Sequence, residues 1–202
     1  MENENKGFRY WFINIFWYHY GKLALVLLAA LIVITIFAVD SIRNKVEYDF
    51  NMAICVEGAI SYNETFELQN IVSKAVGDLN GDGKSQINLQ IIDLADPSNA
   101  EANGYRLQLL MSQPENTLFI FDERYSTTFC SKEDYFDDLS EYGLPYDERL
   151  NNRVNITNTG AVRSIGSDIE FYACLCDWTK VGKGKAELTD AAVRAISAIL
   201  DS

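Results

Sequence analysis

Histidine is almost missing from this 202-residue chain, and its scarcity limits the chemistry that the chain can perform. The single histidine, His19, lies near the N-terminus, before the main part of the sequence. A Ser-His-Asp or Cys-His-Asn system needs an imidazole as its base, and histidine-ligated zinc or iron sites need imidazole as a ligand. The long segment after residue 40 is therefore predicted to contain neither kind of site.

Proline and cysteine are also scarce. Three prolines and plentiful aromatic and β-branched residues argue against a disordered chain. The cysteines are too few and too scattered for a disulfide-rich scaffold, so we expect them to be buried as small apolar side chains: Cys55, Cys130, Cys174 and Cys176. A Cys55–Cys130 disulfide is possible. Cys174 and Cys176 share one face of a strand and are not expected to pair with each other.

Positive charge is in the minority, with 17 lysine and arginine residues against 29 aspartate and glutamate residues and a net charge of −12. An acidic surface repels nucleic acid and anionic lipid headgroups, so we expect no nucleic-acid partner. The same charge is compatible with cation binding and with a soluble domain outside the cell.

One long apolar run, LALVLLAALIVITIFAV, occupies residues 23–39 and contains no charge, proline or glycine. As a helix rising about 1.5 Å per residue it reaches roughly 26 Å, close to the thickness of a bilayer core. A buried core helix is disfavoured because the run has no polar stripe, and a cleaved signal peptide is disfavoured because no small-x-small site follows it. The run is therefore predicted to be a transmembrane helix that anchors the chain in a lipid bilayer.

The residues around this run predict the topology. Residues 1–22 contain eight aromatic residues from Phe8 to Tyr20 that suit the headgroup region, and Lys6, Arg9 and Lys22 slightly outnumber the basic residues just after the run. We expect a cytoplasmic N-terminal segment, a stalk over 40–49 and an extracytoplasmic domain over 50–202 in a single-pass cell-membrane protein.

The rest of the chain alternates between strand-like and helix-like segments. The expected strands are 50–56, 86–94, 117–121 and 169–176. The expected helices run from an N-cap at Asn63 to Gly77, from a capping box at Ser98 and Glu101 to Gln113, from a similar box at Ser131 and Asp134 to Gly143, and from Leu188 to Leu200. Residues 146–168 are expected to form a loop. Continuous apolar strands alternating with helices predict a three-layer α/β domain with a mostly parallel sheet.

The loop before the second strand has the spacing of a calcium site. Its oxygen-bearing positions 1, 3, 5, 7 and 9, with a backbone carbonyl at position 7, are Asp78, Asn80, Asp82, Lys84 and Gln86. The D-x-N-x-D-x-x-x-Q spacing before a strand resembles the calcium loop of galactose-binding proteins. Position 12 is Leu89 and not an acid, so a remote residue such as Glu170 would have to complete a structural Ca²⁺ site. An ordinary turn rich in glycine, asparagine and aspartate is the alternative.

Three carboxylates follow predicted parallel strands. Glu57, Asp93 and Asp122 each lie at the carboxyl end of a strand, where ligands bind in open α/β sheets. Such groups could accept hydrogen bonds from sugar hydroxyls or amines, and two of them could act as acid and base in glycoside cleavage. The alternative is that they cap nearby backbone N–H groups. We treat them as a candidate ligand cleft.

The same order of motifs resembles a known group of proteins. Phe16–Lys22, Asp78–Lys84 and Leu118–Glu123 carry the motifs FWYHYGK, DLNGDGK and LFIFDE. This pattern resembles small membrane-anchored proteins of Gram-positive bacteria whose outer domain is similar to one lobe of type 2 extracellular solute-binding proteins. The resemblance implies an anchored, extracytoplasmic, solute-binding-protein-like lobe.

The sequence thus favours a non-catalytic binding domain that takes a small ligand or a neighbouring membrane protein. A protein-interaction or scaffold module without a ligand site is the second hypothesis. A hydrolase that uses two of the three strand-end carboxylates is the third.

Overall fold

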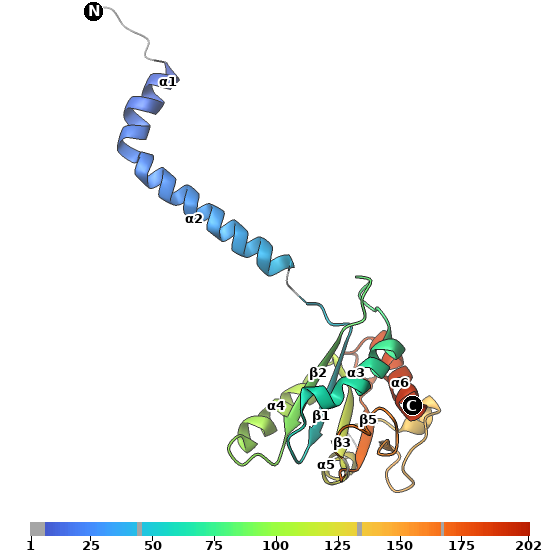
Figure 1. The fold of residues 1–202 in the computed structure, drawn as a ribbon. Helices are drawn as coiled ribbons and strands as arrows, with labels where there is room; N and C mark the ends of the chain where they lie inside the picture. Colours follow the sequence, from blue (N-terminus) through green and yellow to red (C-terminus); the bar gives the residue numbers. More distant parts are fainter. Residues whose placement is uncertain (1–6, 44–45, 133–134, 167) are drawn as a thin grey trace, which may run out of the picture. The chain divides into compact units, whose positions relative to one another are not determined.

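The computed structural model describes residues 7–43, 46–132, 135–166 and 168–202, and it divides into two compact units, residues 1–46 and 47–202. The first unit is helical throughout its described part. It consists of α1 (Phe8–Trp11), a π-helical stretch η1 (Phe12–Trp17) and α2 (Tyr18–Arg43), as Figure 1 shows. The second unit is an α/β domain.

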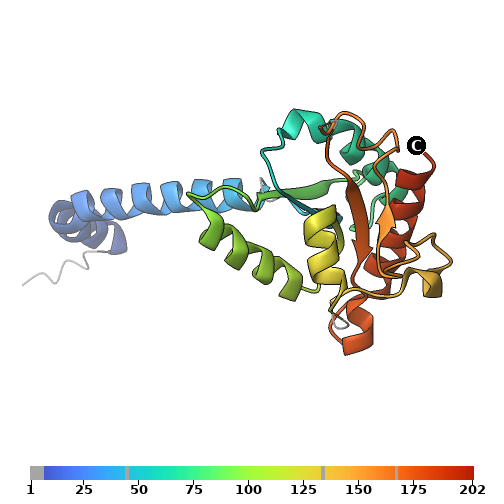
Figure 2. The same cartoon turned by 90° about the horizontal axis from the view of Figure 1, so that it is seen from below.

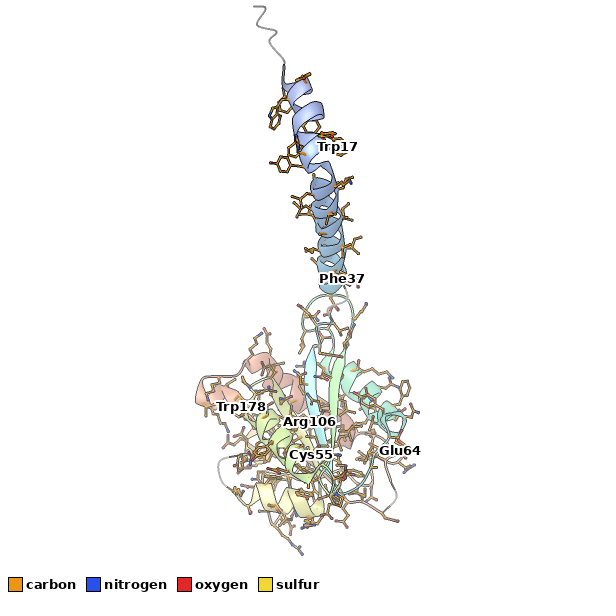
Figure 3. The ribbon with its side chains drawn as sticks, turned by 90° about the vertical axis from the view of Figure 1, so that its left-hand side faces the viewer. Trp17, Phe37, Cys55, Glu64, Arg106 and Trp178 are labelled. Atoms are coloured by element: carbon orange, nitrogen blue, oxygen red, sulfur yellow. The ribbon has the colours of Figure 1, made fainter. Side chains whose placement is uncertain are left out.

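The apolar run lies in a helix, as predicted, and the helix is longer than the run. Residues Tyr18–Asp40 form a continuous helical stretch that is long and apolar enough to cross a membrane, and none of its most apolar part is buried inside the protein. Phe37, labelled in Figure 3, is 70% exposed. A core helix would be covered by other elements, so this exposure argues against that alternative. The expected stalk over 40–49 is shorter than predicted, because α2 continues to Arg43.

The aromatic segment ahead of the span forms a ladder along the helix. The rings of Phe8, Phe12, Phe16 and Tyr20 follow one another with centroid separations of 6.1, 5.4 and 6.0 Å. Trp17 packs directly over Gly21, where a Cβ atom would lie 3.2 Å from the indole ring. The absence of a side chain at residue 21 therefore lets the indole lie flat against the helix.

The second unit contains five strands: β1 (Phe50–Val56), β2 (Ile87–Asp93), β3 (Asn116–Asp122), β4 (Val154–Asn155) and β5 (Phe171–Leu175). They form one sheet in the order β2-β1-β3-β5-β4. The pairs β1–β2 and β1–β3 are parallel, whereas β3–β5 and β4–β5 are antiparallel. All four predicted strands are confirmed, but the expectation of a mostly parallel sheet is not, because the chain returns beside β3 in the opposite direction.

Helices cover both faces of this sheet (Figure 2). On one face, α3 (Phe66–Val76) and α6 (Ala186–Leu200) pack against alternate residues of β1 such as Met52 and Ile54. On the other face, α4 (Ala100–Ser112) and α5 (Glu123–Cys130) contribute to a second cluster with Ala53 and Cys55. Side chains alternate between the faces of a strand, so an uninterrupted apolar strand fits a sheet that is buried on both sides.

The sequence placed the helix before β2 correctly but not its beginning. A 3-10 turn, η2 (Tyr62–Thr65), precedes α3, and Ser61 with Glu64 forms the capping box that starts it. Asn63 therefore lies inside the turn and is not the N-cap. The predicted end at Gly77 is confirmed, and its φ of 76° suits glycine.

Two other predicted helix starts are wrong. The N-cap of α4 is Asn99, which makes no capping hydrogen bond, and the Ser98 hydroxyl donates to Asp96 instead of serving in a capping box with Glu101. Ser131 is the C-cap of α5 and starts no helix, while Asp134 lies outside the described residues.

The acidic segment between α5 and β4 forms only a short turn among its described residues. A 3-10 helix, η3 (Leu139–Tyr142), begins at the N-cap Asp138 and ends at Gly143. The carboxylate of Asp137 accepts the backbone N–H of Asp177 at 2.5 Å, so this residue bonds to another segment. Side chains that bond to backbone in this way compete with regular helix. The two-residue β4 also falls in the range 146–168, where only a loop was expected.

Candidate functional site

The three predicted cleft residues lie at neighbouring strand ends, as the parallel order of β2, β1 and β3 requires. In the sheet register Val56 lies beside Asp93, and Cys55 lies beside Phe121. Glu57, Asp93 and Asp122 therefore gather at one edge of the domain. Their surroundings decide what chemistry is open to them.

Asp122 is the most buried of the three and joins two elements. One carboxylate oxygen accepts the backbone N–H of Glu57 at 2.7 Å, and the other accepts the backbone N–H of Tyr125 at 2.8 Å. The second bond makes Asp122 the N-cap of α5, where a carboxylate also interacts favourably with the helix dipole. Both oxygens are therefore engaged in holding β1, β3 and α5 together.

Asp93 and Glu57 are engaged as well. One oxygen of Asp93 accepts the backbone N–H groups of Gly58 at 3.1 Å and Ala95 at 2.9 Å. Glu57 forms an ion pair with Arg124 in the first turn of α5. Burial, followed by the negative charge of Glu57, raises the pKa of the neighbouring Tyr125. The contacts of Asp93 and Asp122 match the backbone-capping alternative, whereas Glu57 pairs with a side chain. Ligand binding by the three residues stays a prediction.

An open groove of about 650 Å³ begins beside Asp93 and follows β2, the edge strand of the sheet. Its lining comes from the loop after β1, from β2 and from α4: Ala59, Ile60, Tyr62, Asn88, Leu89, Gln90, Ile91, Asp93 and Arg106. Arg106 donates to Gln90 at 2.9 Å across it. Figure 3 labels Arg106 in front of the strands. The groove combines apolar side chains with amide and charged groups, as small-ligand sites do.

The edge of β2 is partly blocked against pairing with another strand. Tyr62 donates its hydroxyl to the carbonyl of Leu89 at 2.6 Å, and Asn103 donates its side-chain amide to the carbonyl of Asp93 at 2.7 Å. An incoming strand would need these carbonyls, so the two side chains protect the edge. The groove is therefore better suited to a small molecule than to an added strand.

The predicted calcium loop closes on its own backbone. Asp78 accepts the backbone N–H groups of Gly81 at 2.6 Å, Asp82 at 3.2 Å and Gly83 at 2.8 Å. The side chain of Asn80 accepts the N–H of Asp82 at 2.9 Å, and that of Asp82 accepts the N–H of Lys84 at 2.8 Å. These are the bonds of an Asx-rich turn. Calcium binding here stays a prediction.

The acid that supports this loop is Asp49, not Glu170. Asp49 is buried, and its carboxylate accepts the backbone N–H groups of Leu79, Asn80 and Gln86 at 2.8, 3.0 and 2.7 Å. Glu170 precedes Phe171, which pairs with Asp122 at the far end of β3, whereas the loop precedes the start of β2. A seven-residue strand spans about 20 Å, so Glu170 cannot complete a site at this loop.

No group of three or more histidine, cysteine, aspartate or glutamate side chains that could hold a metal ion occurs among the described residues. A smaller cavity of about 120 Å³ lies beyond the end of β5, lined by Met111, Tyr135, Phe136, Asp137, Cys176, Asp177, Trp178, Lys180 and Val181. This volume is below the usual range of ligand pockets, about 300–1,000 Å³. The groove beside β2 is thus the better candidate site.

Several residues that matter at these places were not found from the sequence. Arg124 directly follows the LFIFDE motif, so the ion pair with Glu57 could have been proposed from two adjacent strand ends. Asp49, Tyr62 and Arg106 have no recognisable pattern in the sequence, because their partners belong to other segments and depend on the order of the strands in the sheet. We compared the chain with protein-family models, curated proteins and solved structures, and none of them matches it.

Proposed function

We propose that this chain is a single-pass membrane protein with a cytoplasmic N-terminus and a non-catalytic, extracytoplasmic α/β domain that binds a small polar ligand. The observation that carries the proposal is the apolar helix Tyr18–Asp40, whose most apolar part is wholly unburied, in a chain whose second unit has its own core. An exposed apolar surface of that length is unfavourable in water and favourable in a bilayer.

The groove along β2 supports the binding part of the proposal. It offers the Arg106 guanidinium, the Asp93 carboxylate and the amides of Asn88 and Gln90, together with apolar contacts from Ile60 and Ile91. This combination suits an uncharged or zwitterionic molecule with hydroxyl or amino groups. Because Glu57, Asp93 and Asp122 already hold backbone N–H groups or an arginine, a binding role is favoured over a carboxylate hydrolase.

Topology is tested on the full chain in a Gram-positive host. We expect the protein to remain in membranes after alkaline carbonate and to dissolve only in detergent. Protease added to intact protoplasts should digest the second unit and spare an N-terminal tag. An intact mass that lacks the first forty residues would instead indicate a cleaved signal peptide, and protection of the second unit would reverse the topology.

Ligand binding is tested by thermal unfolding of the detergent-solubilised full chain with a panel of sugars, amino acids and amines. We expect a ligand to raise the melting temperature through binding to the native state. Arg106→Ala should abolish the rise, and Arg149→Ala, at an exposed arginine outside the groove, should preserve it. No response to any compound, together with co-purification of a membrane protein, would favour the interaction-module hypothesis.

A further inference from the structure

Two of the buried cysteines lie next to each other in the second core cluster. The sulfur atoms of Cys130, the last residue of α5, and Cys174, in β5, are 3.4 Å apart. Both side chains are almost fully buried, with exposed fractions of 4% and 0%. A disulfide bond is about 2.05 Å long, so closing the gap requires a movement of about 1.3 Å.

We propose that Cys130 and Cys174 form a disulfide bond that fastens the end of α5 to β5. The proposal rests on the extracytoplasmic location proposed above, since disulfides persist outside the reducing cytoplasm. The sequence left a Cys55–Cys130 bond as a possibility, and the short distance between the two sulfurs favours Cys174 as the partner of Cys130.

The other two cysteines are poorer partners for Cys130 or Cys174. Cys55 lies on β1, and β3 separates β1 from β5. Two strand spacings amount to about 9.6 Å, beyond the roughly 7 Å limit between the Cα atoms of a disulfide, which excludes a Cys55–Cys174 bond. The thiol of Cys176 donates to the carbonyl of Tyr135 at 3.1 Å, so its sulfur is engaged with a different segment.

The reaction is an exchange with an external disulfide. The thiolate of one cysteine attacks a protein or small-molecule disulfide and expels one of its thiolates, and the second cysteine thiolate then attacks the resulting mixed disulfide and expels the other. The two thiols lose two protons and two electrons as the new sulfur–sulfur bond forms, and the oxidant is reduced to two thiols. Burial raises the pKa of Cys174, so attack is fastest before α5 covers β5 during folding.

The bond would close a loop around the least regular part of the domain. Between Cys130 and Cys174 the described chain contains only the short η3 and the two-residue β4 as named elements. A disulfide that closes a long loop restricts the unfolded chain most. We expect reduction to lower the melting temperature by roughly 5–15 °C, from the usual stabilisation by such loops in a domain of this size.

The bond is detected by mass spectrometry. The full chain is isolated from membranes with N-ethylmaleimide present at lysis and digested with trypsin without reduction. We expect the peptide 125–132, which contains Cys130, linked to 164–180, which contains Cys174 and Cys176. The link should survive in Cys176→Ala and disappear in Cys174→Ala. A link that disappears in Cys176→Ala would overturn the assignment.

Thermal unfolding gives a second measurement. Reductant should lower the melting temperature of the wild type and of Cys55→Ala, and should leave that of Cys130→Ala unchanged. In a second experiment the purified chain is reduced, unfolded and refolded with oxidised glutathione, and the link is sought again by mass spectrometry. A link that forms on refolding but not in cells overturns the extracytoplasmic location, whereas no link in either experiment overturns the pairing itself.

Discussion

At the scale of single residues, Asp49 shows how one buried carboxylate can organise a loop. Burial acts to raise the pKa of Asp49, but hydrogen bonds from the backbone N–H groups of Gln86, Asn80 and Leu79 outweigh it and leave the pKa below its ordinary value. A lowered pKa in the folded state means that the ionised form stabilises the fold. This contribution is present above the ordinary pKa and is lost as the pH falls through the lowered value.

We therefore predict that Asp49→Ala lowers the free energy of unfolding at pH 7 by about 2–4 kcal/mol, because three backbone N–H groups lose their acceptor. Asp49→Asn keeps one acceptor oxygen and should cost less. The difference between wild type and Asp49→Asn should shrink below about pH 4, where the wild-type carboxyl also becomes neutral. Urea unfolding at pH 7 and pH 3 measures the free energy of unfolding of each variant, with the exposed Asp82→Ala as control. If the difference in free energy of unfolding between wild type and Asp49→Asn were the same at both pH values, the electrostatic explanation would be contradicted.

Arg153 is the most buried cation of the described residues, with a side chain only 2% exposed. Its guanidinium contacts Asp147 at 2.8 Å and Glu123 at 3.1 Å, donates to the hydroxyl of Ser126 at 2.7 Å, and lies 4.1 Å from the ring centre of Tyr172. It thus joins α5, β5 and the irregular segment before β4. A planar guanidinium is needed for contacts in several directions.

We predict that Arg153→Met lowers the free energy of unfolding by about 3 kcal/mol, since it removes a buried guanidinium and leaves the partly exposed carboxylates of Asp147 and Glu123 without their partner. Arg153→Lys should recover less than half of this, because an ammonium cannot make the same set of bonds. The exposed Arg149→Met serves as control and should change stability by less than about 0.5 kcal/mol. Equal stability of the lysine variant and the wild type would contradict a geometric role.

At the scale of elements, the sequence predicted what local pattern determines and missed what distant contacts determine. The four main strands were found because each is an apolar run bounded by polar or turn residues, and β1 was predicted with its observed ends. Helix α5, with the sequence ERYSTTFC, was missed because its threonines favour strand as much as helix. It forms because Asp122 caps it and Arg153 bonds to Ser126 and Thr127 on its surface. The cap at Asp122 is a local signal, whereas the bonds from Arg153 depend on the tertiary fold.

The loop Asp78–Gln86 also shows that a local sequence pattern does not determine the contacts of a segment. Its spacing of acids and glycines fits a calcium loop, and it equally fits a turn whose carboxylates accept backbone N–H groups. Which of the two applies depends on the acids that the tertiary fold brings to the loop: Asp49 lies beside it, and Glu170 lies at the opposite end of the sheet. The candidate cleft shows this as well. The sequence predicted that its carboxylates follow strand ends, but it did not predict which groups they contact.

We predict that excess calcium changes the melting temperature of the full chain by less than about 1 °C, because Asp78 already accepts three backbone N–H groups and Asp49, the acid beside the loop, accepts three more. Thermal unfolding with calcium and with chelator measures this. A calcium-dependent rise that Asp82→Ala removes would instead establish a structural calcium site. Asp96→Ala, in a different exposed loop, is the matched control.

At the scale of the whole molecule, the two units differ in whether their apolar side chains are covered. The second unit hides its apolar side chains between sheet and helices, and the first leaves them uncovered along α2. The same residue types are covered by protein in the second unit and are exposed along the helix of the first. It follows that a change that harms one unit should leave the other intact.

The double substitution Leu28→Arg with Ile32→Arg tests this division, because both residues lie near the middle of the exposed span. Each central arginine costs about 2.5–3.5 kcal/mol of insertion free energy, so the pair should release most of the chain from carbonate-washed membranes. The near-ultraviolet circular dichroism of the second unit should stay unchanged.

Tyr105→Arg with Leu109→Arg, at exposed positions of α4, places the same charge on the folded unit and should leave the chain in the membrane. If the span variant stayed in the membrane, α2 would not be the anchor. If its second unit lost its fold, the two units would not be independent.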